Sequence, residues 1–303
     1  MPAVNGDLPL DRAGRRAYLA FIRAQIAEGR GEPPPPPMRL TAEEEAPLGR
    51  GASPLRTYND ASLSRLLDGL PGTPLSILDV GCGRGHYVEF FRRHGLSGRY
   101  LGIDVVPGAD WERYAAAPSP LEASYRCGPI ETVPLPEAAF DLVLSSSALE
   151  HVEDDRQAVR RIFAATRPGG LGLHLVPGLR SHLLFGYHGY RRYGAGGLTA
   201  LFRDAGFEIL ALHRQGGGVS FLLHMLAIGI LESGLTRGVL HDRLRDGGPD
   251  DRLRGLACRP WLTGLRRPGP LLAIYAALAR AAVRLDPLVP GPTSGYAILV
   301  RRP

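Results

Sequence analysis

Apolar residues along this chain form two kinds of pattern, short unbroken runs and longer runs with helical spacing. The short runs have the length and composition of buried parallel strands, and they cover residues 75–80, 100–104, 140–144 and 171–176. Residues 154–167 lie between two of these runs and place Val159, Ile162 and Phe163 on one helical face. Strands that alternate with helices predict an α/β fold with a doubly wound, mostly parallel sheet.

Additional helices are predicted on both sides of this core. Residues 11–28 form an amphipathic pattern with Asp11 as its N-cap, and the proline run at 33–37 cannot continue a helix. A second helix is predicted at 59–67 and ends at Gly69. We therefore divide the chain into an N-terminal helix and proline-rich linker at 1–38, a core at 39–213, a helical insertion at 214–290 and a final core strand at 291–303.

A glycine-rich loop follows the first apolar run directly. Gly81, Gly83 and Gly85 alternate with other residues, so backbone N–H groups there can approach a ligand closely, and a helix-like stretch follows. Asp104 ends the next strand about 20 residues later, the spacing at which a carboxylate meets ribose hydroxyls. A dinucleotide fingerprint would need glycine at His86, which argues against a nicotinamide-dependent dehydrogenase.

These residues resemble the class I S-adenosylmethionine (SAM) methyltransferases. Residues 78–85, Leu-Asp-Val-Gly-Cys-Gly-Arg-Gly, look like the first signature of that family. Residues 128–152 are similar to its third and fourth strands, and 167–170 resemble the turn into its fifth. The resemblance implies a seven-stranded sheet, with a sixth strand at 206–212 and an antiparallel last strand at 295–300. It also implies SAM as methyl donor and no metal.

The same resemblance implies the cofactor-binding residues. These are Asp79, Gly81, Cys82, Gly83, Gly85, Asp104, Val105, Ile130, Glu131 and Ser145. Asp79 is expected to hold the loop and the amino group of the cofactor, and Arg56, Tyr58 and Asn59 lie within reach in such a fold. Many relatives carry Asp where Pro129 stands, and proline offers adenine neither a side-chain acceptor nor an N–H. Glu131, a backbone carbonyl, or packing with the Ile130 N–H would replace that contact.

Two further segments are candidates for the acceptor side. His151 could be a general base, since imidazole titrates near neutral pH, or a hydrogen-bonded structural histidine. The loop at 180–193 is rich in aromatic and ring-nitrogen groups, and its candidates for substrate binding are Tyr187, His188, Tyr190 and Arg191. The alternative for this loop is a connection whose tyrosines pack against the core.

The insertion contains apolar runs at 219–231 and 271–285, both shorter than the roughly 20 residues of a membrane span. They predict either a helical cap on the core or an element that lies on a membrane surface. Trp261 near Arg259, Arg266 and Arg267 would fit the second alternative. We therefore expect no transmembrane span, with peripheral membrane contact through 219–285 as an open possibility.

Composition adds little to this picture. The 303 residues include 44% hydrophobic and 22% charged residues and three widely spaced cysteines, which suit a protein of the reducing cytoplasm, with the inner membrane surface as an alternative place. The net charge of +6 arises mainly after residue 235 and not at the glycine loop, so we do not expect nucleic acid as partner.

The sequence thus predicts a SAM-dependent methyltransferase that acts on a small or amphipathic acceptor. O-methylation of a hydroxyl on a sugar, a lipid-linked glycan or a compound of natural-product type is the favoured reaction. The sulfonium methyl group is already activated, so the protein has to position the acceptor, and it needs a base only if the acceptor is an unionised hydroxyl or amine. The alternative is a SAM-binding protein without transferase activity that acts as a partner or scaffold.

Overall fold

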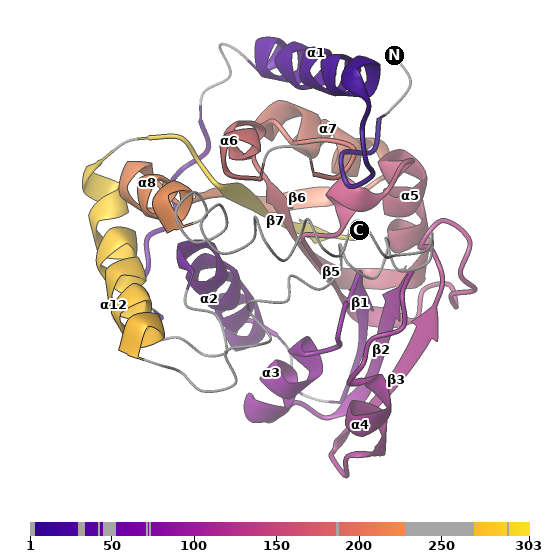
Figure 1. Cartoon of the computed structure of the whole chain (residues 1–303). Helices are drawn as coiled ribbons and strands as arrows, with labels where there is room; N and C mark the ends of the chain where they lie inside the picture. The colour runs from indigo at the N-terminus through magenta and orange to yellow at the C-terminus, as the bar shows by residue number, and fades with distance from the viewer. Residues whose placement is uncertain are drawn as a thin grey trace, which may run out of the picture.

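A seven-stranded sheet forms the centre of the computed structural model, which describes residues 4–29, 34–41, 43–44, 53–70, 72, 74–185, 188–227, 270–289 and 291–303. The strands lie in the order β3-β2-β1-β4-β5-β7-β6 (Figure 1). Their bounds are β1 Leu75–Val80, β2 Gly98–Asp104, β3 Leu121–Cys127, β4 Phe140–Ser146, β5 Thr166–Pro177, β6 Glu208–Gln215 and β7 Gly295–Arg301.

The predicted fold class is confirmed. β1 pairs in parallel with β2 and β4, the β2–β3 and β4–β5 pairs are also parallel, and β7 runs antiparallel to both β5 and β6. The order of strands reverses between β1 and β4, so the carboxyl ends of these two strands form the switch point of the sheet. In open α/β sheets this switch point is where ligands bind.

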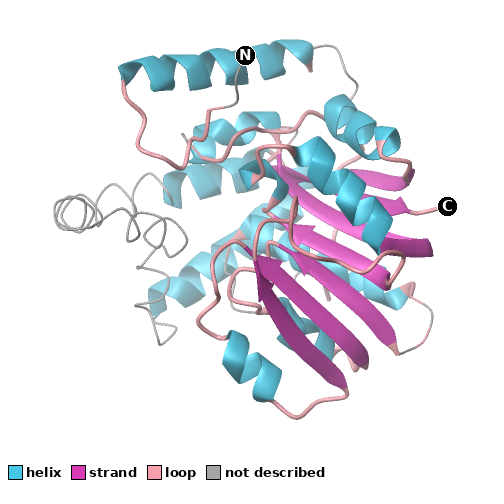
Figure 2. Cartoon of the chain, turned by 90° about the vertical axis from the view of Figure 1, so that its right-hand side faces the viewer, coloured by secondary structure: helices cyan, strands magenta, loops and turns pink. Residues whose placement is uncertain are grey.

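Helices cover both faces of the sheet, as Figures 1 and 2 show. One face packs against α2 (Pro54–Asp68), α3 (Tyr87–Arg93) and α4 (Trp111–Ala116) through a cluster that includes Leu63, Phe91 and Tyr114. The opposite face packs against α5 (Asp155–Ala165) and α7 (Ala195–Asp204) through a cluster that includes Ile162 and Phe202. Burial on both faces explains why the central strands read as unbroken apolar runs.

Two sequence expectations are wrong in detail. The third strand lies upstream of residues 128–152, because 128–139 form a loop in which Pro129, Pro134 and Pro136 cannot donate ladder hydrogen bonds. α2 begins at Pro54 and not at residue 59, because Ser53 caps it by accepting a hydrogen bond from the Arg56 N–H at 3.3 Å. Proline suits the first helical position, where no intrahelical N–H bond is lost.

The N-terminal helix α1 (Arg12–Glu28) lies across the top of the molecule in both views. Asp11 caps it as predicted, and its carboxylate accepts the Gly14 N–H at 2.7 Å. The α1 side chains Tyr18 and Ile22 are buried, and α1 contacts the short η2 helix (Leu179–Ser181) that follows β5. Residues before α1 therefore lie near the carboxyl ends of the strands.

The described ends of the insertion are α8 (Gly218–Ala227) and α12 (Pro270–Leu285), which pack on each other and on α2. Buried Asp286 connects them, since it accepts hydrogen bonds at 2.9 Å from both the Tyr58 hydroxyl and the Ser220 N–H. Residues 228–269 lie outside the described residues, and with them Trp261 and its neighbouring arginines. Among the described helices, none has the length and apolar character that crossing a membrane requires.

Candidate cofactor and acceptor site

The glycine loop joins β1 to α3 at the switch point. All three glycines have positive φ, 71° at Gly81, 54° at Gly83 and 80° at Gly85, a region that other residues adopt with strain. A Cβ on Gly83 would meet no atom within 4 Å, so the backbone there borders open space. A ligand can therefore approach the main chain closely at this position.

The hydrogen bonds of the loop differ from the sequence expectation. The N–H groups of Gly81 and Cys82 donate to the Ile103 carbonyl at 2.9 and 3.0 Å, and the Gly85 N–H donates to the Cys82 carbonyl at 2.8 Å. These donors hold the loop against β2 and are already used within the protein. The Cys82 side chain is buried, and burial raises the pKa of its thiol, so the loop acts by its shape and not through a reactive sulfur.

Asp79 is buried at the end of β1 and is only 1% exposed. Its Oδ2 accepts the Tyr100 hydroxyl at 2.6 Å, whereas its Oδ1 has no hydrogen-bond partner within the described part of the chain. Burial, together with the nearby charge of Asp104, raises the pKa of Asp79 to about 7 despite the hydrogen bond from Tyr100. An unpartnered buried acceptor beside an open glycine backbone fits the ammonium group of a SAM methionine moiety.

Asp104 ends β2 beside the loop, as predicted. Its Oδ2 accepts the Gly83 N–H at 2.8 Å and its Oδ1 accepts the Val106 N–H at 3.1 Å. Each carboxylate oxygen keeps a second lone pair, so the group can still accept hydrogen bonds from ribose hydroxyls. Val105, 64% exposed, follows it and offers an apolar surface to a base.

Residues 128–131 lie next to Asp104, because the Gly128 N–H donates to the Asp104 carbonyl at 2.8 Å. The Ile130 side chain is buried in the core and its carbonyl accepts the Arg161 Nε at 2.7 Å. The half-buried Glu131 follows it. The structure therefore brings 128–131 together with Asp79, the glycine loop, Asp104 and Val105.

Ser145 lies elsewhere. It is fully buried, and its Oγ lies 2.7 Å from the His174 Nδ1, whose ring is 4.5 Å from that of Phe202 on the α7 side of the sheet. Burial lowers the pKa of His174 to about 3, so this histidine is neutral. Ser145 is thus a poor candidate for contact with a ligand, and we omit it from the proposed contacts.

The neighbouring position supplies a hydroxyl on the other face. The Ser146 Oγ lies 3.1 Å from the Tyr87 hydroxyl, which accepts a hydrogen bond from the Arg56 guanidinium at 3.0 Å. This chain of contacts connects α2 to the start of α3 and the end of β4. Of the α2 residues expected near the cofactor, Arg56 joins this network, while the Tyr58 hydroxyl donates to Asp286. Asn59 is buried with its Oδ1 unpartnered among the described residues.

The loop that carries His151 packs directly on the glycine loop. Ser147 has φ of 52°, a strained value for a residue other than glycine, and turns the chain out of β4. A Cβ on Gly81 would lie 2.3 Å from the Cβ of Ala148, so only glycine permits this approach. The short helix η1 (Leu149–His151) follows Ala148 directly and carries His151.

His151 has two partners that the sequence did not reveal as neighbours. Its Nδ1 lies 2.6 Å from the Asp7 Oδ2, and the other carboxylate oxygen of Asp7 lies 2.9 Å from the His188 Nδ1. The two imidazole rings meet edge to face at 4.5 Å. The ligating atoms of the three residues all lie within 4.8 Å of one another. No local pattern around Asp7, which follows an Asn-Gly turn, signals this role.

Charge and burial act on this cluster in opposite directions. Burial raises the pKa of Asp7, but hydrogen bonds from both histidines outweigh it and hold that pKa well below its usual range. Burial lowers the pKa of His151, but its bond to Asp7 and the charges of Glu150 and Asp7 outweigh this and raise it above 6.5. Burial also raises the pKa of Glu150, whose Oε1 lies 3.9 Å from the His151 Nε2.

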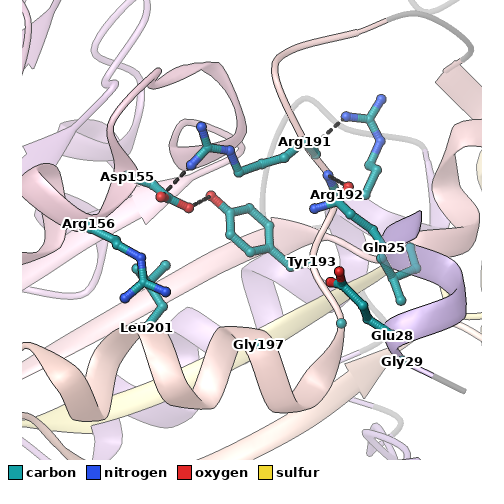
Figure 3. Close-up of a pocket in the computed structure, with 12 residues that line it drawn as sticks. Gln25, Glu28, Gly29, Asp155, Arg156, Arg191, Arg192, Tyr193, Gly197 and Leu201 are labelled. Carbon is teal, nitrogen blue, oxygen red and sulfur yellow. Dashed lines mark hydrogen bonds and ion pairs between the residues drawn. The ribbon is translucent and has the colours of Figure 1, made fainter. Parts of the chain in front are cut away.

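The aromatic loop is divided between this cluster and the core. The Tyr190 N–H donates to the Glu150 carbonyl at 2.7 Å, so Tyr190 and His188 lie beside His151. Arg191 instead forms an ion pair with Asp155, which also accepts the Tyr193 hydroxyl at 3.2 Å (Figure 3). Arg191 therefore holds the loop on α5, and Tyr187 lies outside the described residues.

A cavity of about 190 Å³ lies between α1, this loop and α7, and Figure 3 shows the residues that line it. Gln25 of α1 accepts the Arg192 N–H at 3.2 Å at its edge, and Glu28 and Arg156 also face it. None of its lining residues belongs to the glycine loop. The cavity thus lies where α1 packs against the loop, and it is separate from the proposed donor site.

Comparison with known proteins supports the resemblance to SAM-dependent methyltransferases. A family profile described as a methyltransferase domain matches residues 78–173. A malonyl-acyl-carrier-protein O-methyltransferase from Serratia marcescens is 37% identical over 102 residues, which cover 33% of this chain and 37% of that protein. A ubiquinone biosynthesis O-methyltransferase from Rhodopseudomonas palustris is 34% identical over 148 residues, covering 44% and 56%. The matches thus span about half or less of these relatives.

Solved structures share the fold over a longer stretch. A sarcosine dimethylglycine methyltransferase, so described, from Galdieria sulphuraria has a TM-score of 0.51 and 14% identity over 82% of this chain and 86% of its own. The cyclase SpnF has a TM-score of 0.51 and 20% identity over 100% of this chain and 98% of its own. The profile match, the glycine loop and the strand order together show that residues 78–173 form a methyltransferase domain with the fold of the class I SAM-dependent methyltransferases.

Proposed function

We propose that this protein transfers the methyl group of SAM to a hydroxyl oxygen of a small or amphipathic acceptor. The observation that carries the proposal is the contact between two loops at the switch point. The glycine loop, Asp104 and the Asp79 Oδ1, which has no hydrogen-bond partner among the described residues, would form a donor site, and the loop of His151 packs on the glycine loop at Gly81. In this proposal the donor site and a potential base lie on two loops that contact each other.

The residues of the chain suit SAM in three respects. Asp79 would accept the ammonium group, Asp104 the ribose hydroxyls, and the exposed Val105 with residues 128–131 would flank the adenine. Gly83 leaves the space that a side chain would fill. Bound SAM supplies a methyl carbon that the acceptor oxygen takes, while the electron pair of the broken C–S bond stays on sulfur as S-adenosylhomocysteine (SAH).

The protein itself must position the acceptor and remove its proton. His151 is the candidate base: its neutral form takes the hydroxyl proton and becomes imidazolium. Because the pKa of His151 is raised, the neutral form grows as pH rises through neutrality, and a base-dependent rate should increase with pH there. The names of the relatives, both O-methyltransferases, favour oxygen as the methylated atom.

A direct test combines binding and turnover. Purified protein is incubated with SAM and, separately, a catechol, a simple phenol, a hexose or malonyl-acyl-carrier protein, and methylated product is detected by mass spectrometry. His151→Asn should reduce methylation of a hydroxyl acceptor about 100-fold or more, the usual contribution of a general base. SAH affinity should stay unchanged, and His94→Asn, outside the site, is the matched control. Equal turnover in His151→Asn and wild type would remove the base from the proposal.

The second candidate is a SAM-binding protein that does not transfer methyl groups. It is favoured by one observation, that SpnF, described as a cyclase, shares this fold along the whole chain. SAH binding without a methylated product from any acceptor of the panel would support this candidate against the first.

A further inference from the structure

The segment that precedes α1 forms part of the predicted acceptor side. The Gly6 N–H donates to the Gly189 carbonyl at 2.7 Å, and the Tyr18 hydroxyl donates to the His188 carbonyl at 2.8 Å. A Cβ on Gly6 would lie 2.5 Å from the His188 backbone nitrogen, so the segment before α1 and the loop of His188 are in close contact. Asp7 is thus held at His151 by contacts on both of its sides.

We infer that Asp7 is a positioning residue for His151: it fixes the imidazole with Nδ1–H toward the N-terminal segment and leaves Nε2 as the proton-accepting atom. This inference rests on the proposed methyl transfer to oxygen and adds to it a residue from a remote part of the chain. Asp7 and His151 are separated by 144 positions, and η1 alone would not orient the ring.

The chemistry of the donors fixes the direction of the hydrogen bonds. A carboxylate can only accept, and Asp7 is ionised because its pKa is lowered, so Nδ1 of His151 carries a hydrogen at the 2.6 Å contact. The same holds for Nδ1 of His188 at 2.9 Å. The neutral form of His151 therefore has its lone pair on Nε2.

Charges around His151 come from each segment packed against it. Asp7 belongs to the N-terminal segment, Glu150 to η1, and His188 and Arg192 to the loop after α6 (His182–Phe185). Arg192 lowers the pKa of His151, whereas Glu150 and Asp7 raise it. Glu150 is buried, and its Oε2 lacks a hydrogen-bond partner among described residues. Asp7 is the member that bonds the ring directly.

A metal ion is the competing use of the same three residues. Two ligands on one tetrahedral zinc ion lie about 3.3 Å apart, since each bond is about 2.0–2.1 Å long. The contacts of Asp7 at 2.6 and 2.9 Å are shorter and match direct hydrogen bonds. The distances therefore favour a carboxylate held between two imidazoles.

The test reads the histidine directly and needs no acceptor. Protein labelled with ¹⁵N-histidine is titrated by NMR, and the signals of His151 are assigned by their loss in His151→Asn. Above its titration midpoint, wild-type His151 should show the Nδ1–H form, whereas free histidine favours Nε2–H. In Asp7→Ala the ring should revert toward Nε2–H and its midpoint should move to lower pH. Asp7→Asn, which keeps an acceptor oxygen without charge, should move the midpoint and retain more of the Nδ1–H form.

Controls separate this inference from the proposed function. Asp11→Asn changes the same charge four residues away and keeps a good helix cap, so it should leave the His151 signals unchanged. SAH affinity is measured on each sample and should be the same in Asp7→Ala as in wild type, since Asp7 lies outside the donor site. Loss of SAH binding from every sample would refute the proposed function and not this inference.

Two results would overturn the inference. One is a wild-type His151 that is Nε2–H when neutral, or that does not respond to Asp7→Ala. The other is stoichiometric Zn²⁺ binding that Asp7→Ala abolishes, because the three residues would then be metal ligands.

Discussion

The proposed donor and acceptor halves of this site are built in different ways. The donor half comes from one continuous stretch, β1 to residue 131, in which the proposed cofactor contacts lie at the carboxyl end of a strand or in the loop that follows it. The acceptor half joins Asp7, His151 and His188, which lie in three segments far apart in the chain. The first depends on local backbone geometry and the second on how α1 sits on the body. A local arrangement leaves a signature in the sequence, and an arrangement made by packing does not.

The largest effect is expected from a substitution that blocks only the donor half. Gly83→Arg places a large side chain at φ of 54° in the space beside the loop, so SAH binding should fall by about 1,000-fold or more. Calorimetric titration measures the loss, and circular dichroism checks that the fold is kept. Gly95→Arg, also at positive φ and with open space beside it, controls for backbone strain. Retained SAH affinity in Gly83→Arg would place the ligand elsewhere.

Asp104→Ala should weaken SAH binding by about 10- to 100-fold. It removes charge-assisted hydrogen bonds to the ribose, worth about 1.5–3 kcal/mol, and releases the Gly83 N–H from its carboxylate. The same titration measures the change, with Asp110→Ala as a nearby control. An affinity within twofold of wild type would contradict the role assigned to Asp104.

Asp79 should make the affinity of the donor half for SAH depend on pH. Its pKa of about 7 means that the carboxylate becomes ionised as pH rises from 6 to 8, so SAH affinity should rise up to about tenfold over this range and then level. In Asp79→Asn the affinity should be lower and independent of pH. A flat profile for wild type would show that Asp79 does not meet the ammonium group.

Ionisation of Asp79 is expected to strengthen SAH binding but to lower the stability of the folded protein. Because the folded-state pKa of Asp79 is raised above 3.8, the folded state loses stability relative to the unfolded chain as pH rises from about 4 to 7. Asp79→Asn should therefore raise the free energy of unfolding at pH 8 by roughly a few kcal/mol, and the gain should vanish toward pH 4. Urea unfolding at the two pH values measures it, and equal stabilities at pH 8 would contradict the burial argument.

The smallest effect on the site is expected from the insertion. Asp286→Ala removes the acceptor shared by Tyr58 and Ser220 and should lower the free energy of unfolding by about 1–3 kcal/mol. SAH affinity should change less than twofold, since these hydrogen bonds join α2, α8 and the end of α12 and involve none of the proposed cofactor contacts. Asp286→Asn, which can still accept one hydrogen bond, should cost less. A large loss of SAH affinity would show that the insertion acts on the donor site and does not only cover the core.

The strands and the donor residues were accessible from the sequence for a physical reason. β1 has the predicted bounds, and β2, β4, β5 and β7 differ only at their ends, because strands buried on both faces read as apolar runs. That same burial hid that Ser145 contacts His174 and Ser146 contacts Tyr87 on the other face of the sheet, since an unbroken apolar run shows no alternation between the two faces. The loop N–H groups were expected to approach a ligand, but those of Gly81 and Cys82 bond to Ile103, and these bonds depend on the pairing of β1 with β2.

The acceptor half could be predicted only as a set of separate candidates. His151 and His188 were recognised for their side chains, yet their common partner Asp7 has no pattern around it that distinguishes it from a turn residue. Arg191 was expected to face the acceptor, but the ion pair with Asp155 depends on the position of α5. Such contacts follow from tertiary packing, which local periodicity does not encode.

The central claim, that the switch point binds SAM, is tested most directly by calorimetric titration of the purified protein with SAH. The account predicts binding of one SAH per chain with micromolar affinity. A folded protein that releases or absorbs no heat of binding at any temperature tested, and that also fails to retain SAH in equilibrium dialysis, would contradict it.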